Sequence, residues 1–171
     1  MFHSGRKSPP AGVPGELEHG LPNSATVRVP RIAADIYGAR PVDLTVVDGV
    51  RTLAGGEGSW NRCVRMVEPK VLLAGRNGVC TDAVCTAVMG FDPQAPDRKS
   101  PFPGHNYLNL LAAVGVGTND LSRIEVLGLT LKEVVCPFGA AVAQSRAKHG
   151  NMSEESVVAQ PRFLVVQSEC L

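Results

Sequence analysis

The chain has 171 residues, of which 44% are hydrophobic and 19% are charged, a length and composition typical of one globular domain. Its net charge is +1 and only 5% of its residues are aromatic, so neither a basic surface for nucleic acid nor a platform for stacking bases is indicated. No stretch approaches the roughly 18 apolar residues of a membrane-spanning helix, and MFHSGRKSPP lacks the apolar run of an export signal. We therefore expect a cytoplasmic protein that binds neither nucleic acid nor membrane.

The cysteines contain no CxxC pair, which argues against a zinc ribbon, a ferredoxin-type iron–sulfur cluster and a dithiol redox motif. An odd number of cysteines in a chain without an export signal is typical of reduced thiols in a cytoplasm. The five residues are Cys63, Cys80, Cys85, Cys136 and Cys170.

The N-terminal part of the chain changes character near Val27. Residues 1–26 are rich in proline and glycine, which predicts an extended or disordered arm. The stretch VPRIAADIYGARP then spaces apolar residues as a helix does, with Pro30 near its start and Gly38 as a stop signal. One short helix is predicted here.

Short apolar stretches predict the strands. DLTVVDGV, residues 43–50, is rich in β-branched residues and nearly continuous in apolar character, which predicts burial on both faces. PKVLLAGRNG, residues 69–78, repeats this form, and RIEVLG, residues 123–128, predicts a third strand. RFLVVQ, residues 162–167, predicts a short strand within an otherwise polar tail.

Two helices are predicted between the second and third strands. TDAVCTAVMG has Thr81 as a candidate N-cap, Asp82 in the first turn and Gly90 at its end. NYLNLLAAVGVG, residues 106–117, starts at Asn106, carries an apolar stripe and stops at Gly115 or Gly117.

The order strand, helix, helix, strand predicts an α/β domain with a mostly parallel sheet and flanking helices. Three strands are few for such a sheet. Part of it is therefore expected to be missing, or to come from a partner chain.

Four blocks carry a family resemblance: DLTVVDGVRTLAGGEGSW, VLLAGRNGVCTDAVCTAVMGFDP, LAAVGVGTNDLSRIEVLG and LKEVVCPF. In their order and spacing they resemble the C-terminal half of the family catalogued as domain of unknown function 362. The resemblance implies an α/β domain over residues 27–138, preceded by the arm of residues 1–26 and followed by a divergent tail over residues 139–171. It also implies that the chain is an incomplete, C-terminal portion of a larger α/β domain: a fragment, a truncated product or one half of a split protein.

Some members of that family carry ferredoxin-like iron–sulfur motifs. This implies a further role, as an accessory module of an iron–sulfur redox protein. The cysteine spacing that would bind a cluster is absent from this chain.

The candidate site follows from the predicted sheet. If the first two strands are parallel, their carboxyl ends bring polar residues to one edge. The glycines of AGGEG allow positive φ and close backbone approach, while Glu57 can accept a hydrogen bond or bind a hard cation. Asp48, Glu57 and Asp82 are the candidate ligands of a divalent cation. The predicted ligand-binding residues are Asp48, Gly55, Gly56, Glu57, Gly58, Arg76, Asn77, Thr81 and Asp82.

Each of these features also has a structural interpretation. AGGEG is typical of a surface turn, Asp48 of a turn after a strand, and Asp82 of a carboxylate that stabilises a helix start. Trp60 can be a core or lid anchor. His105 precedes a helix start, where a turn or capping role competes with a catalytic one.

Two functions of different classes remain open. The first is the binding of a polar or anionic small ligand, or a divalent cation, at the carboxyl edge of the sheet. The second is a structural half-domain that docks on a missing N-terminal part, on a partner or on a second copy. No nucleophile, base and orienting group can be named together, so the sequence assigns no reaction.

Overall fold

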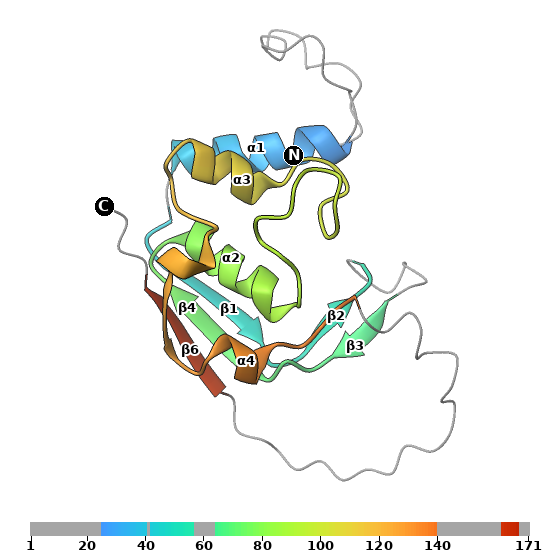
Figure 1. Ribbon diagram of the computed structural model, residues 1–171, viewed down its shortest axis with the longest axis vertical. Helices are drawn as coiled ribbons and strands as arrows, with labels where there is room; N and C mark the ends of the chain where they lie inside the picture. The colour runs from blue at the N-terminus through green and yellow to red at the C-terminus, as the bar shows by residue number, and fades with distance from the viewer. Residues whose placement is uncertain (1–24, 41, 57–63, 140–161, 168–171) are drawn as a thin grey trace, which may run out of the picture.

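The computed structural model describes residues 25–40, 42–56, 64–139 and 162–167, in which the helices α1, α2 and α3 lie on one side of a sheet (Figure 1). The helical elements are α1 (Ala25–Ala39), α2 (Gly78–Val88), α3 (Tyr107–Ala113), the 3-10 helix η1 (Leu121–Arg123) and α4 (Leu131–Val134). The strands are β1 (Thr45–Gly49), β2 (Thr52–Ala54), β3 (Arg65–Val67), β4 (Val71–Gly75), β5 (Glu125–Gly128) and β6 (Arg162–Gln167). No helix in the described part is long and apolar enough to cross a membrane.

The main sheet has four strands in the order β1-β4-β6-β5. β1 is antiparallel to β4 and β5 is antiparallel to β6, so only β4 and β6 run parallel. The α/β class holds as helices plus a mixed sheet, but the prediction of a mostly parallel sheet is wrong. The reason is the hairpin of β2 and β3, which turns the chain back beside β1 without the crossover helix that a parallel pair requires.

The strand predicted in the C-terminal tail is confirmed as β6, and it lies inside the sheet. It pairs with β4 from Val71↔Arg162 to Gly75↔Val166 and with β5 on its other side. The fourth strand of this sheet therefore comes from the chain itself. The segments β2, β3 and α4 were not predicted, because three or four residues are too few to display a period.

The helix α2 packs closely on the inner face of the sheet. Its buried residues Val84 and Val88 join Leu73 and Leu164 in the core. The contact is closest at Gly75, where an added Cβ atom would lie 2.1 Å from the Thr81 hydroxyl oxygen. A side chain at this position of β4 would therefore push α2 away from the sheet.

The predicted first helix is confirmed as α1, but it begins at Ala25, inside the predicted arm. The rest of that arm lies outside the described residues. Pro30 is within the helix, not at its start. Because proline has no N–H to donate to the Thr26 carbonyl, the contact of this carbonyl with His105 is important: the His105 amide donates to it at 3.1 Å. An added Cβ atom on Gly104 would lie 1.8 Å from the same oxygen.

We expect Gly75→Ala to lower the free energy of unfolding by about 1–3 kcal/mol, because overpacking would separate α2 from β4. Gly38→Ala is the matched control, since nothing lies within 4 Å of its added Cβ atom. The free energy of unfolding of this control should rise by about 0.5–1 kcal/mol, because alanine loses less conformational freedom than glycine when the chain folds into a helix. Urea unfolding of both variants measures the difference. Equal tolerance of the two substitutions would contradict the close contact.

Candidate functional site

The predicted site residues do not meet at one edge of the sheet. Asp48 pairs with Leu72 near the start of β4, whereas Arg76 and Asn77 follow Gly75, which pairs with Thr45 at the other end. The prediction assumed that β1 and β4 are parallel. Since they are antiparallel, their carboxyl ends lie at opposite edges, and the expected convergence is wrong.

The glycine-rich loop is described only at its beginning. Gly55 has φ 90° and Gly56 has φ 152°, so the predicted positive φ is confirmed at both glycines. Glu57, Gly58 and Trp60 lie outside the residues that the structure describes. Asp48 is in β1, one residue before its end, and its carboxylate accepts a hydrogen bond from the amide of Val50, just after the strand, at 2.9 Å. This contact matches the structural interpretation of Asp48.

The N-terminus of α2 is capped by Asn77, four residues before the predicted cap Thr81. The Asn77 side-chain oxygen accepts from the Cys80 amide at 3.0 Å, and its Nδ2 atom donates to the Val116 carbonyl at 2.9 Å. Thr81 is fully buried and its hydroxyl donates to the Asn77 carbonyl at 2.8 Å. Both predicted ligand residues therefore contribute contacts within the protein.

Another contact at the same helix end involves α1. The Gly78 amide donates to the Tyr37 hydroxyl oxygen at 2.8 Å. The amides of Gly78 and Cys80 thus have partners within the chain, as helix starts require. The start of α2 therefore contacts three other parts of the chain, and we call this place the joint: α1, the sheet and the segment after α3. Arg76, the cation expected to assist an anionic ligand here, is exposed beside this joint.

Asp82 lies in the second turn of α2, not in the first, because the helix begins at Gly78. The Tyr107 hydroxyl donates to its Oδ2 atom at 2.9 Å. Burial raises the pKa of Asp82, and the Tyr107 hydrogen bond offsets part of this rise. Burial and the charge of Asp82 raise the pKa of Cys85 to about 12, so this thiol stays protonated at neutral pH. Burial and Asp82 also raise the pKa of Tyr107.

The described ranges contain no assembled set of ligands for the predicted metal site. No three histidine, cysteine, aspartate or glutamate side chains gather there in a way that could hold a metal ion. Asp48 is near the end of β1 that lies away from Asn77. Asp82 accepts a hydrogen bond from the Tyr107 hydroxyl. Glu57, the central residue of that prediction, is outside these ranges.

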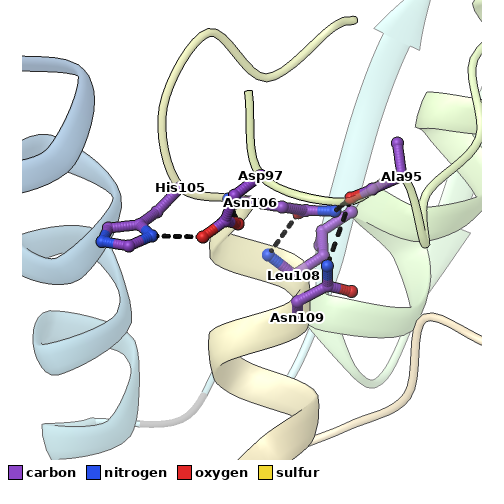
Figure 2. A network of polar contacts seen from close by, with 6 residues as sticks. All are labelled: Ala95, Asp97, His105, Asn106, Leu108 and Asn109. Atoms are coloured by element: carbon purple, nitrogen blue, oxygen red, sulfur yellow. Dashed lines mark hydrogen bonds and ion pairs between the residues drawn. The ribbon is translucent and has the colours of Figure 1, made fainter. Parts of the chain in front are cut away.

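A polar network that sequence reasoning missed centres on Asn106 (Figure 2). This side chain is fully buried and caps α3 by accepting from the Leu108 amide at 3.0 Å. Its Nδ2 atom donates to the carbonyls of Pro93 and Ala95, both at 2.9 Å. The sequence predicted a helix start at Asn106. It did not predict that the same side chain would also bind the loop that contains Pro93 and Ala95.

The same network orients a histidine. The Asp97 Oδ1 atom accepts from the Asn106 amide at 2.8 Å, and its Oδ2 atom contacts His105 Nδ1 at 2.5 Å. The Asn106 amide, and then the His105 contact, lower the pKa of Asp97. Figure 2 shows the His105 ring between Asp97 and the helix α1. Asp97 was not predicted, because it comes from an aperiodic loop in which no spacing links it to His105.

The outer face of the sheet carries an apolar surface that is exposed to solvent. Val46 is 66% exposed and Phe163 is 64% exposed, so the predicted burial of the first strand on both faces is wrong. Side chains alternate between the two faces along each strand, and the pairing brings six outward apolar residues together. We call this surface the open face; its residues are Val46, Leu72, Ala74, Leu127, Phe163 and Val165.

Acidic residues flank the open face at its two ends. Asp48 lies beside Leu72, and Glu125 lies opposite Gln167 at the other end. An apolar patch with a polar border is typical of a protein interaction surface.

Comparison of the chain with protein-family models, curated proteins and solved structures found no match. The resemblance to domain of unknown function 362 stays a prediction.

The raised pKa of Asp82 predicts a pH dependence of stability. The folded state holds the proton on the Asp82 carboxyl group more tightly than the unfolded chain does. The stability that this proton contributes is fully present below the ordinary aspartate pKa of 3.8 and is lost as pH rises through the pKa of the folded state. Asp82→Asn removes this loss, which amounts to about 1.4 kcal/mol for each unit of pKa difference. Urea unfolding across a pH series should show the variant gaining on the wild type as pH rises from acid toward neutral. Exposed Asp43→Asn is the control, and parallel profiles for Asp82→Asn and the wild type would contradict the prediction.

The Asn106 network predicts that aspartate in place of Asn106 lowers the free energy of unfolding much more than aspartate in place of Asn109. Asn106→Asp keeps the cap acceptor but replaces the donor to two carbonyls with a carboxylate oxygen, which should cost about 2 kcal/mol or more. Asn109→Asp is the control, because Asn109 is half-buried and donates to one of these carbonyls at 3.2 Å. Thermal and urea unfolding should show the larger loss for Asn106→Asp. A smaller loss than in the control would mean that Asn106 is not the centre of the network.

Proposed function

We propose that this chain is a docking module whose open face binds an amphipathic helical segment of a partner polypeptide. The single observation that carries the proposal is the exposure of the open face in a sheet whose other face is covered by helices. Val46 on the edge strand β1 and Phe163 on the inner strand β6 both present large apolar side chains to solvent. Burial of apolar surface is the dominant favourable contribution to most protein association.

The arrangement of the helices supports this proposal. α1, α2 and α3 all lie on the same side of the sheet (Figure 1). The face of a sheet that stays in contact with water is commonly polar, whereas strands that are covered on both faces are apolar on both. The strands β1, β4 and β6 have this composition, since apolar side chains point outward as well as inward. A second helical layer would bury the outward set.

The size of the open face favours helices over a second copy of the sheet. Four strands about 4.8 Å apart and five residues long at about 3.3 Å per residue cover roughly 300 Å² in projection. A stable interface between two proteins commonly buries about 800 Å² on each partner, so two flat faces of this size are too small on their own. A partner segment that forms two helices, each about 10 Å in diameter, matches the width of the sheet. Such helices also bring further contacts along their edges.

Site-specific photo-crosslinking in native cells tests this proposal. Benzoylphenylalanine in place of Phe163 or of Val46 should give crosslinks to the same helical segment of another polypeptide, identified by mass spectrometry. The control position is Val114, which is 70% exposed but lies at the end of α3. It should not give this crosslink. Crosslinks only to a second copy, or none from either position, would contradict the proposed partner.

A charged residue introduced on the open face should prevent docking of the partner while leaving the protein folded. Phe163→Asp should change the free energy of unfolding by no more than about 0.5 kcal/mol, because the side chain is exposed. The same substitution should abolish the crosslink formed from Val46, since docking would bury an unpaired charge. An intact Val46 crosslink in Phe163→Asp would argue against docking on this face.

A further inference from the structure

A cleft of about 460 Å³ lies between α1 and α3, on the helical side of the molecule. Figure 1 shows these two helices side by side, with α2 between them and the sheet. Its lining residues are Arg31, Ala34, Asp35, His105, Leu110, Ala113 and Val114. The volume is within the range of about 300–1,000 Å³ that is typical of small-molecule sites.

The cleft has a polar side and an apolar side. α1 contributes Arg31 and Asp35, which are four residues apart and therefore share one face of the helix. α3 contributes Leu110 and Ala113 and its C-cap contributes Val114, and none of these residues carries a charge. A ligand that fits both sides has a charged end and a compact apolar body.

Backbone contacts hold the loop of His105 against α1. The His105 amide donates to the Thr26 carbonyl, the acceptor to which Pro30 has no N–H to donate. Gly104 allows this approach, since any side chain there would collide with the same carbonyl. The position of His105 relative to Arg31 is therefore set by the backbone and not only by side-chain packing.

The imidazole of His105 is oriented as well as positioned. Asp97 contacts its Nδ1 atom, and Asp97 is itself held by the Asn106 amide. This leaves the Nε2 edge directed toward α1, as Figure 2 shows. A preorganised polar group binds a ligand without the cost of ordering its side chain. The charged groups near this ring are Arg31 and Asp35 on α1 and Asp97 and Arg98 in its own loop.

We propose that this cleft binds an aliphatic 2-amino or 2-hydroxy acid. Arg31 binds the carboxylate of the ligand. Asp35 and the Nε2 atom of His105, whose Nδ1 atom faces Asp97, are the acceptors for the ammonium or hydroxyl group on the adjacent carbon. The aliphatic side chain of the ligand packs on Leu110, Ala113 and Val114. Asp35 disfavours a second carboxylate at the same end, so the ligand is a monocarboxylate.

The test uses the full chain and four probes of the same carbon skeleton: leucine, 2-hydroxy-4-methylpentanoate, 4-methylpentanoate and 3-methylbutylamine. Isothermal titration calorimetry should show saturable binding of leucine or of the hydroxy acid, weaker binding of 4-methylpentanoate and none of the amine. A preference between the first two probes identifies whether the amino acid or the hydroxy acid is the ligand. No binding of either one, or binding of the amine as strong as theirs, would overturn the proposal.

Variants locate the binding. Arg31→Gln and His105→Gln should each weaken binding of the preferred probe by about tenfold or more, because each removes a contact to a charged group. Asp97→Asn should weaken it less, since Asp97 acts only by positioning His105. Arg40→Gln is the matched control, because Arg40 directly follows the last residue of α1 and its side chain is 84% exposed. Circular dichroism checks that each variant is folded, and Arg31→Gln decides the outcome if His105→Gln is not. Unchanged affinity in the folded cleft variants would overturn the assignment, whatever the result for the open face.

Discussion

The close packing of α2 on β4 is the constraint on which the described fold depends. Gly75 provides the space for it, and the Thr81 hydroxyl fills that space while donating to the Asn77 carbonyl. With α2 at this distance, Asn77 can hold the segment after α3, and the start of the helix can bind the Tyr37 hydroxyl of α1. One tight contact between a helix and a strand therefore aligns the other helices with the sheet. It also explains why predicted ligand residues at this point are structural: their polar atoms already have partners within the protein.

The one-sided arrangement of the helices separates two surfaces of different character. The open face is apolar and lies on the outer side of the sheet, whereas α1 and α3, which line the cleft, are on the opposite side of α2 (Figure 1). A partner on the open face would leave the cleft accessible, so the two proposed interactions are compatible. They also rest on different physical effects. The first depends on the area of apolar surface removed from water, and the second on a few oriented polar groups beside an apolar wall.

Local signals predicted several elements correctly because their causes are local. Gly115 has φ 77° just after α3, and Gly90 has φ 79° after α2, so both stop signals reflect a backbone conformation that glycine adopts readily. RFLVVQ matches β6 at both ends. The helix start at Asn106 was also correct. The start of α2 was not, since Asn and Thr are both good caps and only the tertiary contact with Val116 and Tyr37 distinguishes them.

The sequence by itself determined where most helices and strands form, because periodicity, caps and glycine stops act within a few residues. Only the tertiary structure decided the direction of β1, the exposure of Val46 and the pairing of Asp97 with His105. An apolar β-branched run looks the same in a parallel and an antiparallel strand, and it does not record whether a second layer covers it. Strand direction depends on the connection that follows, here the short hairpin of β2 and β3. Side chains from an aperiodic loop meet only when distant parts of the chain hold that loop in place, as Asn106 and the Thr26 carbonyl do.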